Sequence, residues 1–211
     1  MTRLKFTIIG SSNAIGLEST SPKHPIFIKN GVTLLNKSVR GLNTKGKQSK
    51  KSFLKYKFVS RPRQFYILFL GPNGFRYRNF NKFLRTYLQN IRTLTQSVPA
   101  KRLIVVLPLP RGHLGLHKRQ MLSTKDFGTQ LINLGLHVVN PYMHLPHRLR
   151  HIKYLFGKKD LKKRKYVHFS QTVRNKIYYS IGDKIRDITN SIRAPEFVTN
   201  RMQSLDIHST F

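Results

Sequence analysis

The sequence contains no cysteine and no tryptophan among its 211 residues. Without cysteine the chain can form neither disulfide bonds nor thiolate metal sites, which excludes a small secreted fold held together by disulfides. Apolar runs are short, and none approaches the ~18 residues that a membrane-spanning helix needs. Only a brief apolar patch, Phe6 to Ile9, follows the first residues, so the N-terminus resembles neither a signal peptide nor an arginine-rich transit helix.

Acidic residues are also scarce, with seven Asp and Glu against 40 Lys and Arg and a formal net charge of +33. No acidic residue occurs between Glu18 and Asp126. A charge of this size opposes a compact state unless a polyanion neutralises it. The 14 Phe and 9 Tyr lie among the cations, which favours a folded protein whose surface faces RNA and whose rings stack on bases.

The shortage of carboxylates argues against catalysis, because general acid–base chemistry needs paired or tuned acidic groups. Asp183 and Asp187 are four residues apart beside Lys184 and Arg186, a spacing that helical ion pairing explains. No Gly-x-Ser-x-Gly nucleophile pattern occurs. The sequence therefore predicts no catalytic residue, no enzymatic activity and no cofactor.

Two pairs of histidines have a spacing found among metal ligands, His113 with His117 and His147 with His151. Arg and Lys surround each histidine, and neither cysteine nor glutamate joins either pair, so the local charge opposes a divalent cation. The pattern predicts no metal site.

Residues 41–48, GLNTKGKQ, match the motif of a phosphate-binding loop at every position but the last. That loop needs Ser or Thr where Gln48 stands, and it needs a strand before it and a helix after it. The flanking residues favour neither, so this segment is predicted to be a basic arm.

Composition divides the chain into three parts. Residues 1–62 are interrupted by polar clusters such as Gly10-Ser11-Ser12-Asn13 and are predicted to be a basic N-terminal extension. Residues 63–170 hold the denser apolar pattern of a domain. Residues 171–211 are a C-terminal extension, whose isoleucines at spacings near four predict a helix that ends at Pro195.

Apolar periodicity gives the order strand, helix, strand, strand, helix, strand within the central part. The predicted elements are a strand at 64–70, a helix from Asn79 to before Pro99, strands at 102–107 and 129–139, a helix from Pro146 to Gly157, and a strand at 166–169. This order predicts an α+β fold, a ferredoxin-like split βαβ sandwich, with a basic hairpin between its second and third strands and an extra C-terminal helix.

Residues 63–170 resemble small-subunit ribosomal protein ten. The resemblance depends on the order of the elements and on four short motifs: the strand Phe65 to Leu70 before a long helix, Pro108-Leu109-Pro110 after the second strand, Ser123 to Phe127, and Val138 to Pro141. It implies the same ferredoxin-like fold, with a hairpin that enters ribosomal RNA. The hairpin expected here, between Pro110 and Asp126, is shorter than usual in that family.

The resemblance implies a structural constituent of the small subunit of a mitochondrial ribosome. Its partners would be ribosomal RNA and other small-subunit ribosomal proteins, with no membrane and no small-molecule substrate. The location would be the mitochondrial matrix, and synthesis inside the organelle would explain the lack of an import signal. The alternatives are a ribosomal protein of another family, an organellar nucleoid DNA-binding protein, and a fragment of an RNA-processing enzyme.

The candidate contacts to ribosomal RNA are cations and histidines on the expected hairpin and its flanks. Glycines at 112 and 115 would let the hairpin backbone approach phosphates. The predicted binding residues are Arg61, Arg63, Arg76, Arg78, Arg111, His113, His117, Lys118, Arg119, Lys125, Lys162, Lys163 and Arg164.

Overall fold

The computed structural model describes residues 3–20, 23–28, 31–45, 49–73, 75, 79–109, 114–143, 152–158 and 168–205, with the backbone alone at 20, 114–118, 152–153 and 194–205. The strands are β1 (Leu4–Gly10), β2 (Val32–Asn36), β3 (Gln64–Phe69), β4 (Leu103–Val106) and β5 (His137–Val139). The helices are α1 (Leu17–Thr20), α2 (Pro25–Ile28), α3 (Phe80–Thr95), α4 (Leu114–Asn133), α5 (Ile152–Leu155) and α7 (Gln171–Leu205), with short 3-10 helices η1 (Phe53–Lys55) and η3 (Ala100–Arg102).

The five strands form one sheet in the order β2-β1-β3-β4-β5, and every neighbouring pair is parallel. The residues of the central strands explain this arrangement. Five of the six residues of β3 and all four of β4 are buried apolar or aromatic residues, so both faces of these strands must be covered. A sheet that is apolar on both faces needs helices on both sides.

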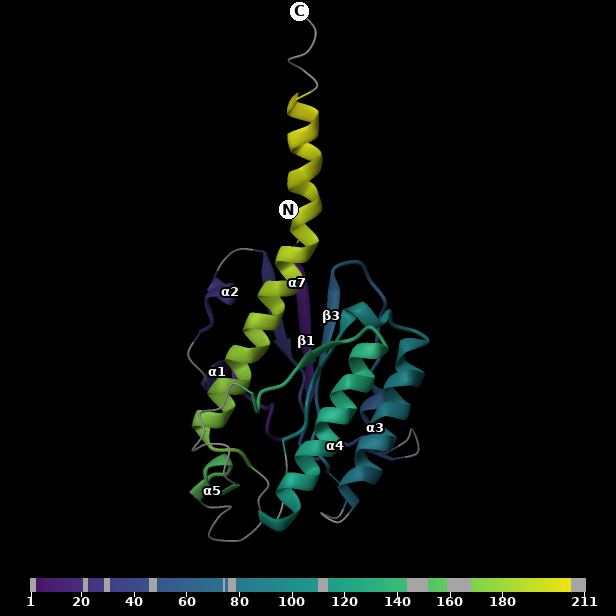
Figure 1. The fold of residues 1–211 in the computed structure, drawn as a ribbon, viewed down its shortest axis with the longest axis vertical. Helices are drawn as coiled ribbons and strands as arrows, with labels where there is room; N and C mark the ends of the chain where they lie inside the picture. Colours follow the sequence, from purple (N-terminus) through teal and green to yellow (C-terminus); the bar gives the residue numbers. More distant parts are fainter. Residues whose placement is uncertain are drawn as a thin grey trace, which may run out of the picture.

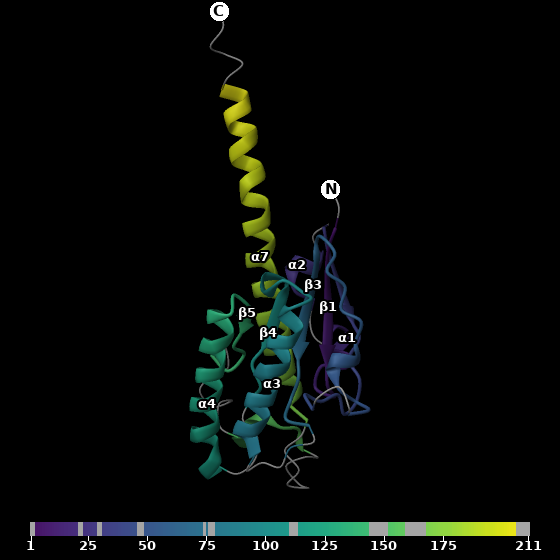
Figure 2. The ribbon, with the colours of Figure 1, turned by 90° about the vertical axis from the view of Figure 1, so that its right-hand side faces the viewer.

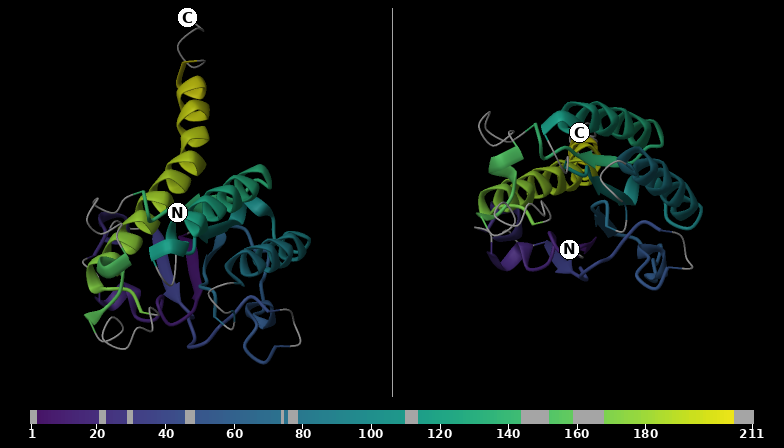
Figure 3. Two further views of the ribbon diagram at one scale, coloured as in Figure 1. Left: turned by 60° about the horizontal axis from the view of Figure 1, so that its bottom comes forward. Right: turned by 90° about the horizontal axis from the view of Figure 1, so that it is seen from below.

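Helices cover the two faces and produce three layers (Figures 1 and 2). The long helix α7 crosses one face, where α1 and α2 pack against it. Helices α3 and α4 lie side by side on the other face. Figure 3 shows the helices on both faces of the sheet from two further directions. Two hydrophobic cores result, one on each side of the sheet.

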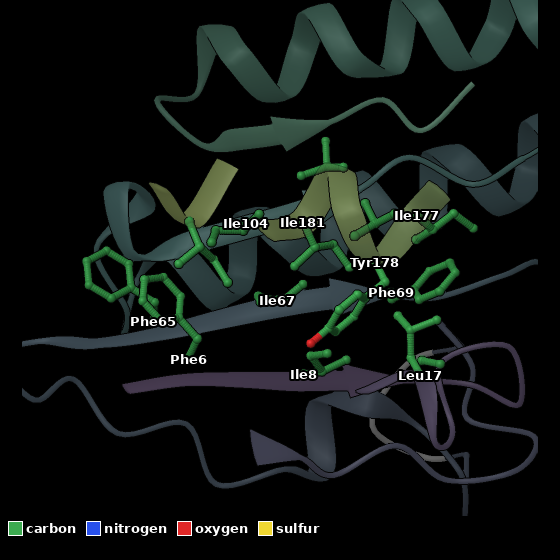
Figure 4. Close-up of a cluster of buried hydrophobic side chains, with 14 of the residues drawn as sticks. Phe6, Ile8, Leu17, Phe65, Ile67, Phe69, Ile104, Ile177, Tyr178 and Ile181 are labelled. Atoms are coloured by element: carbon green, nitrogen blue, oxygen red, sulfur yellow. The ribbon is translucent and has the colours of Figure 1, made fainter. Parts of the chain in front are cut away.

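The core under α7 follows from isoleucines spaced four apart, at Ile177, Ile181 and Ile185. All three are fully buried. Figure 4 shows Ile177 and Ile181 above Ile67 of β3. Beyond the sheet, the backbone of α7 continues as a projecting helix (Figure 1). Within the described part of the chain, no helix is both long enough and apolar enough to cross a membrane.

The structure contradicts the predicted ferredoxin-like sandwich, because that fold requires antiparallel strands and this sheet is entirely parallel. Three central elements are nevertheless confirmed: the strand at 64–70, the helix after Asn79 and the strand at 102–107 correspond to β3, α3 and β4. The error lies in how the strands pair, which periodicity within a single element does not determine.

The predicted basic hairpin and the strand at 129–139 are also wrong. Most of this region is the helix α4, and only residues 137–139 form a strand. Among the described side chains of α4, the buried positions are Gln120, Thr124, Phe127, Gly128 and Leu131, a helical spacing in which two members are polar. The buried Thr124 hydroxyl donates a hydrogen bond to the Gln120 carbonyl oxygen at 2.8 Å. The alternating pattern depended partly on Ile132, which is 60% exposed.

The flanking segments contribute to the same cores as the central part. Residues 1–62, predicted to be an extension, supply β1 and β2, and β1 lies inside the sheet between β2 and β3. Residues 171–211, predicted to be a second extension, supply α7, which continues past Pro195 to Leu205. Of the predicted helix at 146–157 the structure describes only residues from 152, as the short α5. Of the predicted strand at 166–169 it describes only residues 168 and 169, and Phe169 forms an isolated bridge with Phe156.

Replacing Ile181 by alanine tests how strongly α7 is anchored to the sheet. Ile181 is fully buried, so Ile181→Ala should lower the free energy of unfolding by about 2–5 kcal/mol. Ile192→Ala is a matched control on the same helix, because Ile192 is 40% exposed and should cost less than about 1 kcal/mol. Denaturant unfolding of both variants measures the difference, and equal losses would contradict the packing of α7 on the sheet.

Candidate functional site

The carboxyl ends of β1 and β3 form the point at which the chain reverses its direction across the sheet. From β1 the chain passes to β2 on one side, and it then returns to place β3 on the other side. In open parallel sheets such a switch point opens a crevice between loops, where ligands bind. The two strand ends are joined here, because the Ser11 backbone N–H donates to the Phe69 carbonyl oxygen at 3.2 Å.

A tight turn after β1 presents Ser12 at this edge. The Ala14 N–H donates to the Ser11 carbonyl oxygen at 2.9 Å, and the turn leads into α1. Gly10 permits the turn to pack closely: a β-carbon there would collide with the Ala14 β-carbon and lie 2.9 Å from the Phe69 carbonyl oxygen. Ser12 itself is half-buried.

The loop after β2 passes beside the Ser12 turn. Its Val39 N–H donates to the Gly10 carbonyl oxygen at 3.0 Å. Gly41 then adopts a φ of 75°, in the left-handed region that favours glycine. Gly41 thus turns the backbone at the switch point.

The loop after β3 presents the amide side chain of Asn73. Its Nδ2 donates to the Leu42 carbonyl oxygen at 3.0 Å, which connects this loop to the loop after β2. A primary amide carries two N–H donors. One of them donates to the Leu42 carbonyl oxygen, and the second can donate to an oxygen atom of a ligand.

His168 comes from a distant part of the chain but is held beside the Ser12 turn. The Phe169 N–H donates to Asn13 Oδ1 at 2.9 Å, so the residue after His168 is bonded to the residue after Ser12. The Gly157 N–H donates to the His168 carbonyl oxygen at 3.0 Å. His168 is exposed, which leaves its imidazole accessible from solvent.

A small pocket opens between these loops. Its polar lining residues are Ser11, Asn13 and Asn73, and the other lining residues are aromatic, aliphatic, proline or glycine. The lining residues are Ser11, Asn13, Phe69, Leu70, Gly71, Pro72, Asn73, Pro108, Leu109, Phe156 and Phe169. An apolar pocket with a few polar groups at its edge is the usual form of a small-molecule site.

Glu18, the acidic residue nearest to this turn in sequence, supports it structurally. Its Oε2 accepts from Asn36 Nδ2 at 2.6 Å, and the same amide donates to the Ala14 carbonyl oxygen at 2.6 Å. Arg174 of α7 donates to the Ile15 carbonyl oxygen at 2.6 Å. Burial lowers the pKa of the Arg174 guanidinium, and the Glu18 carboxylate acts in the opposite direction.

Ser12, His168 and Asn73 together supply the groups that acyl transfer requires. A hydroxyl can act as a nucleophile when a base accepts its proton, and an imidazole is such a base. N–H donors that face the reacting carbonyl stabilise the negative charge that develops on its oxygen. The loops at this edge therefore carry residues of the three kinds that cleavage of a carbonyl derivative uses.

The predicted RNA-binding residues that the structure describes do not gather on a hairpin. Arg61 and Arg63 are exposed just before β3, at the amino edge of the sheet, and Arg119 and Lys125 are exposed on α4. His117 and Lys118 belong to α4, where the structure describes their backbone only. The remaining predicted residues lie outside the described part: Arg76, Arg78, Arg111, His113, Lys162, Lys163 and Arg164.

The histidine pairs cannot be placed, because His113, His147 and His151 lie outside the described residues and the side chain of His117 is not described. In the part of the chain that is described, no group of three or more His, Asp or Glu side chains could hold a metal ion.

The three residues of the candidate site were missed by the sequence analysis. Gly10 to Asn13 appeared to be a polar interruption in an extension, because the apolar patch before it is short. The available signal was a glycine two residues before a serine, directly after an apolar run. Nothing in the sequence connects Asn73 or His168 with Ser12, because only the parallel pairing and the Asn13–Phe169 hydrogen bond bring them together.

Solved structures with a similar fold are hydrolases. A lipase/acylhydrolase from Enterococcus faecalis aligns with a TM-score of 0.53 at 15% identity, covering 89% of this chain and 96% of that one. A member of the lipolytic protein G-D-S-L family from Veillonella parvula aligns with a TM-score of 0.53 at 14% identity, covering 83% and 94%. An acetylxylan esterase from Geobacillus stearothermophilus gives 0.52 at 10% identity, covering 87% and 94%. No protein-family model and no curated protein sequence matches the chain.

These similarities establish the class of fold, a parallel α/β fold of the kind found in these hydrolases. They overturn the resemblance to small-subunit ribosomal protein ten, together with the predicted ribosomal role, the partners ribosomal RNA and ribosomal proteins, and the nucleoid alternative. They also overturn the prediction that the chain is not an enzyme, which depended on the scarcity of carboxylates, and the prediction that it has no small-molecule substrate. The mitochondrial location stays a prediction.

Gly10→Ala tests the close packing of the Ser12 turn. The added methyl group would overlap Ala14 and approach Phe69 and Ser38, so the variant should lose about 1–3 kcal/mol of unfolding free energy. Gly71→Ala is the matched control, since its β-carbon would meet only Ser11 Oγ at 3.9 Å, an ordinary contact. Chemical denaturation compares the two variants, and a Gly10→Ala protein as stable as wild type would refute the packing described here.

Proposed function

We propose that the protein is a serine hydrolase of carboxylic esters, with Ser12 as nucleophile, His168 as general base and Asn73 as a donor to the oxyanion. The observation that carries the proposal is that the loops bearing these three residues meet at the switch point of the sheet. Hydrogen bonds from Asn73 to Leu42 and from Phe169 to Asn13 hold their loops together.

In the first half of the reaction, His168 accepts the hydroxyl proton as Ser12 Oγ attacks the ester carbonyl carbon. The carbonyl oxygen becomes an oxyanion, which the second N–H of the Asn73 amide stabilises. The tetrahedral intermediate collapses when the C–O bond to the alcohol breaks. His168 returns its proton to the departing alkoxide, and the acyl group stays on Ser12.

In the second half, water replaces the alcohol. His168 accepts a proton from the water molecule as it attacks the acyl carbon, and a second tetrahedral intermediate forms. Its collapse breaks the bond to Ser12 Oγ, which takes the proton back from His168. The products are the free acid and the restored hydroxyl.

The comparisons support this proposal through what the similar proteins are called, namely lipase/acylhydrolase and acetylxylan esterase. The similar protein from Veillonella parvula belongs to a family named by the letters G-D-S-L. Taken as residue codes, these agree with Gly10-Ser11-Ser12-Asn13 at the first and third positions, which includes Ser12. The residue between, Ser11, is not acidic and is buried, with its backbone bonded to β3.

Ser12→Ala should abolish ester hydrolysis, because the attacking oxygen is removed. With 4-nitrophenyl acetate we expect kcat to fall at least ~10³-fold, and His168→Gln should lose a similar factor because the base is missing. The measurement is the initial rate of nitrophenolate release by purified full-length protein.

Ser19→Ala is the control for this experiment. Ser19 lies on α1, where its hydroxyl donates to the Gly16 carbonyl oxygen at 3.0 Å, and it should leave the rate unchanged. If Ser12→Ala keeps the wild-type rate, the proposed function is refuted. The same holds if the wild-type protein hydrolyses none of a range of simple esters.

Asn73→Ala separates stabilisation of the oxyanion from binding. We expect kcat to fall about 10²–10³-fold with a small change in KM, because the interaction forms chiefly in the transition state. Asn73 also holds Leu42, so the free energy of unfolding should be measured alongside. A rise in KM with kcat unchanged would assign Asn73 a role in ground-state binding instead.

A further inference from the structure

We infer that the ester cleaved at this site carries a negatively charged group, which Arg40, Lys45 and Lys51 bind beside Gly41 and Asn73. We call these three residues the rim cations. The inference rests on the proposed function, since it specifies the class of substrate for the same site.

Lys51 lies directly against the loop that carries Gly41. A β-carbon built on Gly41 would be 3.4 Å from Lys51 Nζ, so the ammonium group is beside the backbone of Gly41. The Asn43 N–H donates to the Lys51 carbonyl oxygen at 2.9 Å and fixes the backbone of this lysine. One residue beyond Gly41, the Leu42 carbonyl oxygen accepts from Asn73.

Lys45 contacts the aromatic ring of the loop that carries Asn73. Its Nζ lies 6.0 Å from the centre of the Phe75 ring, and Phe75 is two residues beyond Asn73. The backbone N–H of Lys45 donates to Asn43 Oδ1 at 3.0 Å. Arg40, exposed and adjacent in sequence to Gly41, adds a third positive charge to this rim.

No carboxylate neutralises the rim cations within the described part of the chain. Residues 19–125 contain no acidic residue. Glu18 is bonded to Asn36, Asp183 and Asp187 pair with cations of α7, and Asp126 is on α4 in the groove with α3. None of the ion pairs formed among these residues includes Arg40, Lys45 or Lys51.

Three neighbouring cations repel one another, and a bound anion relieves that repulsion. Their position beside Asn73 would place the charged group next to an acyl group attacked by Ser12. Charged recognition of this kind raises the affinity for an anionic ligand over a neutral one of equal shape, and salt weakens the preference. A neutral ester would gain nothing from the rim cations.

Calorimetric binding of two uncleaved analogues to the full chain tests this directly. The probes are 4-acetamidobenzoate and its uncharged counterpart 4-acetamidobenzamide, which share an acetyl group and differ in one charge. We expect the benzoate to bind wild type ~10-fold more tightly at low ionic strength, with the ratio shrinking in added salt. Equal affinities for the two probes would overturn the inference.

A variant with matched net charge separates a local site from the general basicity of the chain. Arg40→Gln, Lys45→Gln and Lys51→Gln combined should reduce the ratio of affinities to about one. The control combines Lys5→Gln, Arg61→Gln and Lys101→Gln, exposed cations near the amino ends of β1, β3 and β4, and should retain the ratio. A ratio lost equally in both variants would overturn the rim site in favour of non-specific attraction.

Hydrolysis of 4-acetoxybenzoate and 4-acetoxybenzamide by the same proteins keeps the two proposals distinguishable. Charge-selective binding without any turnover would refute the hydrolase and leave the anion site in place. Equal turnover of both esters, dependent on Ser12, would support the hydrolase and refute the anionic substrate. Preferential turnover of the benzoate that requires the rim cations would support both.

Discussion

A parallel sheet with two apolar faces needs a covering layer on each side, and this requirement organises the whole chain. Strands β3 and β4 are buried on both faces, so neither α3 and α4 nor α7 alone can shield them from water. The C-terminal region of the chain therefore returns to the sheet, where α7 lies over β1 and β3. Parallel pairing also directs every strand toward one edge, which brings separate loops together.

The same constraint explains how the candidate site can use residues so far apart in sequence. Asn13 and Phe169 are 156 positions apart, and their hydrogen bond is possible only because the chain reaches α7 through the carboxyl edge of the sheet. The covering of the sheet and the hydrogen bond between Phe169 and Asn13 are thus consequences of one path of the chain. A change that loosens α7 should also disturb the site, even at a distance from it.

Local periodicity was sufficient where one kind of residue dominates an element. The strand β3, the helix α3 and the isoleucine stripe of α7 follow from their apolar spacing. It failed in α4, where buried Gln120 and Thr124 interrupt the stripe, and in β1, where the polar residues Lys5 and Thr7 interrupt the apolar run. Pairing direction and the meeting of Ser12, Asn73 and His168 depend on contacts between distant segments, which no local pattern contains.

The scarcity of acidic residues takes a different meaning in this fold. In an RNA-bound protein the cations would be spread wherever phosphate is near, whereas here an acid-free stretch includes the loops that border a candidate catalytic site. Ser12 and His168 require no acidic residue in the chain to exchange a proton, so few carboxylates do not exclude hydrolysis. An acidic residue near Gly41 would instead neutralise Lys51 and weaken the attraction for an anionic ester. The composition that argued against an enzyme is thus compatible with one that acts on anions.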